Sequence, residues 1–490
     1  MTEPKGRILA NALNYMAGQG AIAVFGLASS IVLARYLPKA VFGQYSFLLA
    51  LAIIFMPFLD MGGHTLYLVE GARDRTKIGV SWSRAVALKL RMLVPTAGVI
   101  ALYFLAFKPH TIDIVYLLVL LYTIAQSMLL STDVAFRPAE QGRSWAIRRV
   151  VYESTAFVLI VIALTVYRVH SAGTLLLIAI AATTAAVIWA VHTVVHLTRL
   201  TWAQFWGAVV RPFGRAEIRA LWPFALNTGL WVFYYRETNI FLENFGHHAE
   251  TDLADFRVIF QIMTSALYVP KAVVWASVPR IAFHDEQDNR EEFRRLLRQF
   301  SGINTWLAAF YTLGGLLYGE KLIGLVFGHK YAHLGLAWTL FDVVLGLMFL
   351  QQYCTDMLNG IREEHQVVRG LLFGVSILTV ASFFLVPLYG TVGAAIAQIL
   401  AAGVMVPLNL SALARRVGSE NLHGVSLIRL GAALAVSGLC GFLLLRIDFY
   451  LSLAVFLAVM PLSSYLLGAF PEHFDRMARR LTAKIRLARS

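Results

Sequence analysis

The stretch TLLLIAIAATTAAVIWAVHTVV, from Thr174 to Val195, contains no lysine, arginine, aspartate or glutamate. A helix of roughly 20 apolar residues crosses about 30 Å of hydrocarbon while satisfying its own backbone hydrogen bonds. Similar stretches follow one another from Asn11 to Phe470. The composition agrees, because 58% of the residues are hydrophobic and only 14% are charged. The sequence therefore predicts an all-α membrane protein that crosses the bilayer many times.

We predict about 14 transmembrane helices in two bundles around a central cavity. The expected spans are 11–36, 41–63, 84–107, 113–136, 145–169, 174–200, 221–242, 253–279, 301–318, 334–360, 365–387, 391–415, 424–446 and 448–468. The expected domains are a six-helix bundle at 1–200, an amphipathic cytoplasmic connector at 201–220, a second six-helix bundle at 221–415, two additional helices at 416–470 and a basic cytoplasmic tail at 471–490.

The net charge of +14 is distributed unevenly between the two sides of the membrane. About 30 of the 42 lysine and arginine residues fall in alternate connections and at the two ends, for example in Arg199–Arg219 and Arg476–Arg489. Because positive residues concentrate on the cytoplasmic side, this pattern predicts that both termini lie in the cytoplasm. The same distribution argues against a nucleic-acid-binding surface.

A polar stripe follows the expected span 253–279. Arg257, Gln261, Thr264, Tyr268 and Lys271 recur at helical spacing and therefore share one face of a helix. Ionisable residues inside a membrane are costly unless they face a cavity or a partner. We predict that the stripe lines a hydrated cavity; a buried polar interface between helices is the alternative.

The preceding span, 221–242, contributes Arg236 and Glu237 together with Tyr234 and Tyr235, and Asp255 follows near the start of the next span. These charges are candidates for substrate or ion binding. The structural alternative is an ion pair between the two helices, either Arg236 with Asp255 or Glu237 with Arg257.

Two acidic residues, Asp342 and Asp356, share one face of the span 334–360. Asp342 is a candidate cation or proton site, with polar packing as the alternative.

Other charges lie close to the predicted cytoplasmic surface. Asp133 and Arg137 are spaced to form an ion pair along one helix. Lys89 and Arg91 are expected to extend their side chains to that surface.

Several enzyme motifs are absent from the sequence. It has no Gly-Lys-Ser/Thr phosphate loop, no Gly-x-Ser-x-Gly elbow and no His-Glu-x-x-His motif. His247 and His248 lack the neighbouring ligands that a metal site needs. We therefore expect no cofactor, no bound metal, no ATP hydrolysis and no enzymatic activity.

Five short motifs occur in order at the span boundaries. The first, LARYLPKAVFGQY (Leu33–Tyr45), resembles the Ala-Arg-x-Leu-Gly…Phe-Gly-x-Tyr turn of bacterial polysaccharide exporters of the Wzx flippase type, in the multidrug/oligosaccharidyl-lipid/polysaccharide export (MOP) superfamily. Pro38 stands where that family usually has glycine. Phe42 and Tyr45 are expected at the lipid–water boundary. The remaining motifs are Asp60–Gly63, Phe327–Tyr331, Asn359–Gly360 and Pro387–Ala395.

The resemblance implies a flippase that moves a polyprenyl-diphosphate-linked oligosaccharide across a bacterial inner membrane by alternating access. Its partners would be that lipid-linked substrate, membrane lipids, and a glycan polymerase and glycosyltransferases. For Arg35, simple contact with lipid phosphates is the alternative to substrate contact. The candidate substrate-binding residues are Arg35, Arg236, Arg257, Gln261, Thr264, Tyr268, Lys271, Tyr234 and Tyr235, and the candidate ion-coupling residues are Glu237, Asp255 and Asp342.

Two other functions compete with this interpretation. A drug or cation antiporter of the same superfamily would need a net acidic cavity, whereas the polar stripe is cationic. A membrane-embedded glycan polymerase or ligase would need a sizeable outward loop for its catalytic groups, and the outward connections here are short. A non-transporting scaffold for the synthesis machinery is a third alternative.

Overall fold

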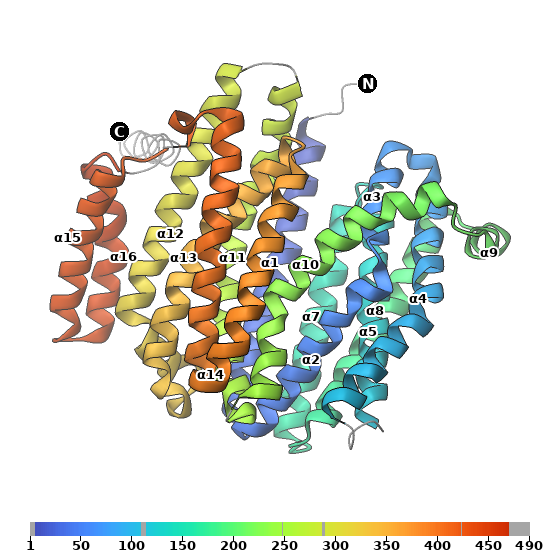
Figure 1. Ribbon diagram of the computed structural model, residues 1–490, viewed down its shortest axis with the longest axis horizontal. Coiled ribbons are helices and arrows are strands. Elements are labelled where there is room, and N and C mark those ends of the chain that lie inside the picture. Colours follow the sequence, from blue (N-terminus) through green and yellow to red (C-terminus); the bar gives the residue numbers. More distant parts are fainter. Residues whose placement is uncertain (1–4, 109–113, 247, 287–289, 423, 470–490) are drawn as a thin grey trace, which may run out of the picture. The chain divides into compact units, whose positions relative to one another are not determined.

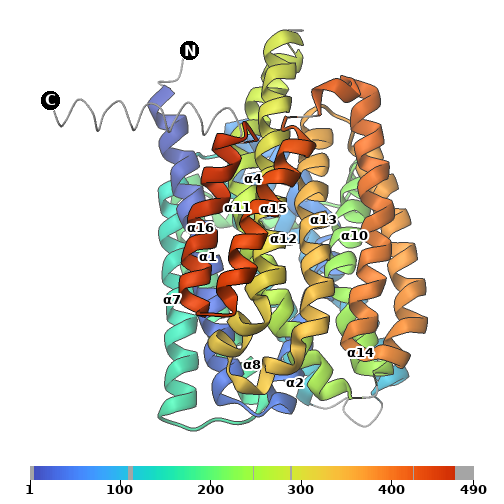
Figure 2. The same cartoon turned by 90° about the vertical axis from the view of Figure 1, so that its left-hand side faces the viewer.

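The computed structural model describes residues 5–108, 114–246, 248–286, 290–422 and 424–469, and the side chains of these residues except 5–13, 250 and 272–286. Over these ranges the regular structure is helical, with no β-strand (Figures 1 and 2). Each predicted span falls on a helix. Nine helices in the described ranges are long and apolar enough to cross a membrane. The all-α, multi-pass fold predicted from the sequence is confirmed.

The chain divides into two compact units. The first comprises residues 1–262 together with 382–394. Its elements, which run from blue to green in Figure 1, are α1 (Lys5–Tyr36), α2 (Lys39–Asp60), α3 (Gly63–Arg73), η1 (Arg75–Lys77), α4 (Ile78–Phe107), α5 (Ile114–Ser131), α6 (Asp133–Phe136), α7 (Gly142–Thr165), α8 (Ala172–Thr198), α9 (Trp202–Val210), α10 (Arg215–Phe245) and the first part of α11 (Ala249–Glu286).

The second unit comprises residues 263–381 and 395–490. It contains the rest of α11 and most of α14 (Glu364–Val417), and α15 and α16 lie side by side in both views (Figures 1 and 2). The domain boundaries predicted from the sequence stay a prediction, and the basic tail 471–490 lies outside the described residues. The other elements of this unit are α12 (Arg290–Phe327), η3 (His329–Leu334), α13 (Gly335–Gly360), η4 (Ser419–Asn421), α15 (Leu427–Leu445) and α16 (Phe449–Leu466).

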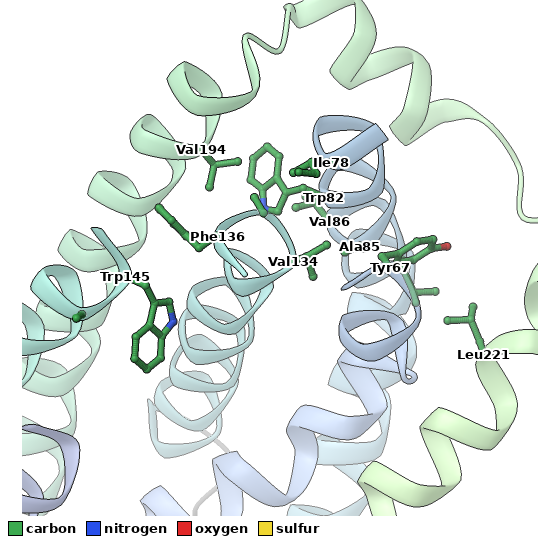
Figure 3. Close-up of a cluster of buried hydrophobic side chains, with 13 residues drawn as sticks. Tyr67, Ile78, Trp82, Ala85, Val86, Val134, Phe136, Trp145, Val194 and Leu221 are labelled. Atoms are coloured by element: carbon green, nitrogen blue, oxygen red, sulfur yellow. The ribbon is translucent and has the colours of Figure 1, made fainter. Parts of the chain in front are cut away.

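A cluster of buried aromatic and aliphatic side chains joins six helices of the first unit (Figure 3). Tyr67 on α3, Trp82 on α4, Phe136 on α6 and Trp145 on α7 are each at most 3% exposed. Large side chains packed this closely gain many dispersion contacts, which hold helices together where lipid weakens the hydrophobic effect. The cluster therefore fixes these helices relative to one another within the first unit.

An ionic node connects α6 to α7 beside this cluster. Asp133 forms the predicted ion pair with Arg137, at 3.6 Å, and the structure adds Arg148 at 3.4 Å. The Trp145 indole donates a hydrogen bond to the same carboxylate at 2.8 Å. The prediction for Asp133 and Arg137 is confirmed, but the buried partner, Arg148, comes from the next helix.

A second buried ion pair joins α2 to α4. The ammonium group of Lys89 pairs with Asp60 and donates a hydrogen bond to Ser127 at 2.9 Å. The backbone N–H of His64 donates to the second Asp60 oxygen at 3.1 Å. Lys89 is only 1% exposed, so the prediction that it reaches the cytoplasmic surface is wrong. An acidic partner on a neighbouring helix holds it inside the bundle.

Replacing Asp60 with asparagine is expected to destabilise the protein by about 3–5 kcal/mol, because Lys89 would be left buried without its counter-charge. The midpoint of thermal unfolding of the purified protein in detergent measures this loss. Asp74→Asn is the matched control, because Asp74 lies in an exposed connection. An unchanged midpoint for Asp60→Asn would contradict the structural role of the pair.

The connector between α8 and α10 contains the short amphipathic helix α9. Thr201 and Gln204 form a capping box at its start, which satisfies two backbone N–H groups. Trp202 and Trp206 are 77% and 53% exposed. A helix with exposed tryptophans beside a basic connector suits the membrane interface.

Two arginines of α4 hold the end of α9. Arg84 donates to the carbonyls of Ala208 and Arg211, at 3.1 and 2.6 Å, and pairs with Glu217 at 2.5 Å. Arg91 donates to the carbonyls of residues 209–211 at 2.9–3.1 Å. These carbonyls at and just beyond the end of α9 would otherwise lack partners, and cations are favoured at the C-terminal end of a helix dipole.

The carboxylate of Glu217 is shared between Arg84 and Tyr67, whose hydroxyl donates at 2.5 Å. Burial raises the pKa of Glu217, but the hydrogen bonds from Arg84 and Tyr67 outweigh it and hold the pKa below its usual value. Because the pKa of Glu217 is lower in the folded state than in the unfolded state, the ionised carboxylate stabilises the fold fully above the unfolded-state pKa. This stabilisation is lost as the pH falls through the folded-state pKa. The connector is therefore anchored at neutral pH.

A tight turn within α14 separates its two membrane-crossing arms. Gly390 has φ +53° and ψ −128°, a conformation that residues with a Cβ rarely adopt. A Cβ at Gly393 would lie 2.1 Å from the carbonyl oxygen of Leu385. These two glycines therefore allow the tight turn and the close approach of the backbone on either side of it.

Candidate functional site

The five residues of the predicted polar stripe all lie on α11, so the helix itself is confirmed. Arg257 and Gln261 belong to the first compact unit, and Thr264, Tyr268 and Lys271 to the second. Their role in substrate binding stays a prediction. Arg257 and Lys271 have different surroundings.

Arg257 lies beside a group of hydroxyl-bearing side chains in the first unit. Its guanidinium lies near the side chains of Tyr45 on α2 and Tyr122 on α5. The part of the chain that the structure describes provides no ion pair or hydrogen bond to Arg257. A membrane-embedded cation without a counter-charge is costly, and an anionic ligand would relieve that cost.

The hydroxyl groups around Arg257 are connected by an amide. The amide nitrogen of Gln126 on α5 has two hydrogens to donate and lies within hydrogen-bonding distance of three hydroxyls, those of Tyr122 at 2.9 Å, Tyr152 on α7 at 3.0 Å and Thr183 on α8 at 3.2 Å. The Tyr152 and Thr183 hydroxyls are themselves 3.0 Å apart. We refer to Arg257 with Tyr45, Tyr122, Gln126, Tyr152 and Thr183 as the hydroxyl cluster.

The hydroxyl cluster has the chemistry of a site for a polar, anionic group. Its arginine supplies a planar charged donor, and its hydroxyls and amide both donate and accept hydrogen bonds. The cluster draws on five helices, so its geometry depends on how they pack within the unit.

The structure corrects the sequence-based expectation for Phe42 and Tyr45. Both were expected at the lipid–water boundary, but they are only 1% and 4% exposed. Both residues face the interior of the first unit, where Tyr45 lies near Arg257. Sequence reasoning missed Tyr45, Tyr122, Gln126, Tyr152 and Thr183 as possible site residues. One available signal was the i,i+4 spacing of Tyr122 and Gln126, which puts both on one face of the helix.

The candidate residues of α10 lie among aromatic rings. Tyr235 stacks on Trp231, with ring centroids 5.5 Å apart and planes 20° apart. Tyr234 is 1% exposed and contacts the same indole edge-on. The guanidinium of Arg236 lies 4.8 Å from the ring centroid of Phe260 on α11. Glu237 is fully buried. The roles of these side chains in sugar or ion binding stay predictions.

Two candidates lie near the turn between α1 and α2. Asp255 pairs with Lys39 at 2.8 Å, which ties α11 to the start of α2. Arg35 is exposed at the end of α1. An ion-coupling role for Asp255 and a substrate role for Arg35 stay predictions.

Lys271 lies in the second unit with an acidic neighbour. It interacts electrostatically with Asp356 on α13, and its ammonium nitrogen lies 5.8 Å from the ring centroid of Tyr268. Asp356 accepts a hydrogen bond of 2.6 Å from Gln352. Unlike Arg257, Lys271 therefore has a counter-charge within its own unit.

Asp342 is a buried acidic residue of α13 in the second unit. It is fully buried, and within the described chain neither carboxylate oxygen has a hydrogen-bond donor of good geometry. Its carboxylate packs against α12 at Gly315, where a Cβ would lie 2.1 Å from one oxygen. A buried carboxyl group with no well-formed hydrogen bond suits a site that exchanges a proton or a cation, so the predicted coupling role is retained as a proposal.

Of the histidine pair noted in the sequence, His247 lies outside the described residues, and the backbone carbonyl of His248 accepts hydrogen bonds from Thr251 and Asp252. The described residues contain no group of three or more potential metal ligands.

No protein-family model and no curated protein matches the sequence. The fold, in contrast, is shared with solved transporter structures. The lipid II flippase MurJ in its inward closed conformation matches with a TM-score of 0.67 at 10% identity, covering 93% of this chain and 98% of MurJ. A MATE transporter in complex with MaL6 gives 0.59 at 15% identity, covering 84% and 97%. A MOP superfamily transporter from Pyrococcus furiosus gives 0.59 at 14% identity, covering 84% and 96%.

These matches define the class of fold. The chain is a multi-pass membrane protein with the fold of MOP superfamily transporters and flippases.

Proposed function

We propose that the protein is a flippase that translocates a polyprenyl-diphosphate-linked oligosaccharide from the cytoplasmic to the outer leaflet of a bacterial inner membrane. Translocation proceeds by alternating access between two helical bundles and without ATP hydrolysis. The diphosphate and sugars cross through a polar cavity, while the prenyl chain stays in lipid. The product feeds the assembly of a cell-surface polysaccharide, with glycosyltransferases and a glycan polymerase as partners.

The observation that carries this proposal is the surroundings of Arg257. A cation without a partner among the described residues lies beside hydroxyl and amide groups of four other helices. An anionic diphosphate supplies the missing counter-charge, and sugar hydroxyls exchange hydrogen bonds with the tyrosines and Gln126. A cationic drug would meet charge repulsion at the same place.

The extent of the structural matches also supports a lipid-linked cargo. The match to MurJ, which is named as a lipid II flippase, covers 93% of the chain, whereas the match to the MATE transporter in complex with MaL6 covers 84%. The Pyrococcus furiosus transporter is described as having a reversed polarity of its binding pocket, so pocket charge varies within this fold.

The sequence contains no phosphate-binding loop. Translocation is therefore driven by an ion gradient, by the membrane potential or by removal of the product. Asp342 is the strongest coupling candidate, because it is fully buried and its carboxylate forms no hydrogen bond of good geometry with the described residues. Glu237, which is fully buried, and Asp255 are the other two.

Deleting the gene is expected to remove the surface polysaccharide and to cause its lipid-linked precursor to accumulate on the cytoplasmic side. Lipid extraction with mass spectrometry measures the precursor, and re-expression of the wild-type protein is the control. Normal polysaccharide with raised drug sensitivity in the deletion strain would contradict the proposal and support a drug antiporter.

A further inference from the structure

Two adjoining cavities open on the first unit along α2, α4 and α10, with volumes of about 690 and 310 Å³. Met61 and Trp222 line both, so the two form one continuous groove. We refer to it as the α2–α10 groove. It is separate from the hydroxyl cluster, with which it shares no residue.

One end of the groove is strongly cationic. Arg91, Arg215 and Arg219 line the larger cavity. Arg91 is fixed by its hydrogen bonds to the carbonyls beyond α9 and by the ring of Phe213, 4.6 Å from its guanidinium. Arg215 and Arg219 are exposed and lie one helical turn apart on α10.

No acidic side chain in the described chain neutralises this end. Glu217 lies between Arg215 and Arg219 in sequence, but its carboxylate is taken by Arg84 and Tyr67. The described residues provide no ion pair to Arg215 or Arg219. Like charges one turn apart destabilise a helix slightly, so a bound anion would stabilise this arrangement.

The other end of the groove is apolar. The smaller cavity is lined by aliphatic and aromatic groups of α2 and α10, including Pro57, Phe58, Leu226 and Phe233. Gly229 leaves space there, because a Cβ at this position would meet only the Cβ of Pro57, at 3.9 Å. The wall of the smaller cavity therefore has no side chain at Gly229, and its roughly 310 Å³ of space lies along apolar groups of α2 and α10.

Along α10, charged residues come first and apolar residues follow, which is the order of the charged headgroup and the apolar chain in a lipid. Arg215 and Arg219 come first, Trp222 follows and is 61% exposed, and the wall is then apolar as far as Phe233. Phe233 follows Arg215 by 18 positions, a rise of about 27 Å along the helix. Tryptophan at the boundary between charged and apolar segments is typical of a membrane interface. The cationic end lies on the side that the charge pattern assigns to the cytoplasm.

We propose that the α2–α10 groove is a second binding site for the carrier lipid, in addition to the transport cavity. Arg91, Arg215 and Arg219 bind the diphosphate, and one prenyl chain lies between α2 and α10. This inference rests on the proposed function. A diphosphate, with more than one negative charge and a single chain, fits three cations and a single-chain groove better than a two-chain phosphodiester lipid does. The site retains the lipid-linked substrate at the cytoplasmic leaflet before it is transported.

The test is binding of a polyprenyl diphosphate to the purified full-length protein in detergent, measured by native mass spectrometry. The double variant Arg215→Gln with Arg219→Gln is expected to weaken binding at least tenfold, because it removes two charge-assisted contacts. The matched control is Arg143→Gln with Arg199→Gln, which removes two exposed arginines of the same unit outside the groove. All variants must keep the wild-type unfolding midpoint.

A second arm tests the chain-binding half. Gly229→Leu fills the apolar end and is expected to weaken binding of the polyprenyl diphosphate, whereas inorganic diphosphate is expected to bind only weakly to every variant. Gly98→Leu is the control, because a Cβ at Gly98 on α4 meets nothing within 4 Å.

Unchanged polyprenyl diphosphate binding by both groove variants would overturn the proposal. Equal affinity of the wild-type protein for phosphatidylglycerol would also overturn it, because that result would indicate an ordinary phospholipid site. These outcomes are distinct from failure of the proposed function. If wild-type protein moves no lipid-linked oligosaccharide across vesicles, the function fails; if it does, but the groove variants bind normally, only the groove assignment fails.

Discussion

Replacing Arg257 with glutamine is expected to lower export of the lipid-linked oligosaccharide by about 100-fold while leaving thermal stability at or above that of the wild type. Removing one member of a buried charge pair formed with a ligand costs about 2–5 kcal/mol of binding. Stability behaves differently, because neutralising a membrane-embedded cation without a protein partner removes a cost rather than an interaction. The combination of lost transport and retained stability is specific to a ligand-binding role.

The export level of Arg257→Gln is measured as surface polysaccharide in a deletion strain, and stability as the unfolding midpoint in detergent. Arg446→Gln is the matched control, because it removes an exposed arginine just beyond α15. Normal export by Arg257→Gln would contradict the role of the hydroxyl cluster. Misfolding of that variant would instead mean that Arg257 belongs to the structural framework.

Neutralising Lys271 is expected to have a second, different effect. Its counter-charge, Asp356, lies in the same unit, so Lys271→Gln leaves Asp356 without that counter-charge and lowers stability as well as transport. Pairing Lys271→Gln with Asp356→Asn removes both charges and is expected to restore stability but not transport. The coupling energy between the two sites is expected to be about 0.5–3 kcal/mol.

A double-mutant cycle on the unfolding midpoints of the four proteins measures this coupling, with transport assayed in parallel. Additive effects on stability would show that Lys271 and Asp356 do not form a pair. Full transport by the double variant would show that the pair is structural only and would remove Lys271 from the substrate site.

Much of the fold is predictable from the sequence, because membrane spans are set by a local property. A helix such as α8 needs only an uninterrupted apolar stretch long enough to cross the bilayer. The polar stripe of α11 was also predictable, since Arg257 and Gln261 recur at helical spacing within one segment. Both inferences use neighbours in sequence.

The partners of individual charges were not predictable in the same way. Lys89 was expected at the surface, but it pairs with Asp60, and the two were too far apart in sequence for spacing to indicate contact. Lys39 and Asp255 are separated by 216 positions. Which polar groups meet depends on how the helices pack, and a single sequence contains no direct record of that packing. For the same reason, Tyr45 was assigned to the interface and not to the surroundings of Arg257.

The most direct test of the account is translocation in vesicles that contain only the purified protein, a lipid-linked oligosaccharide and no nucleotide. Accessibility of the oligosaccharide to an external glycosidase or lectin gives the translocated fraction. The account predicts that wild-type protein moves the lipid-linked oligosaccharide without ATP and that Arg257→Gln reduces the rate to that of protein-free vesicles. A strict requirement for ATP, or equal rates with wild-type and Arg257→Gln protein, would contradict it.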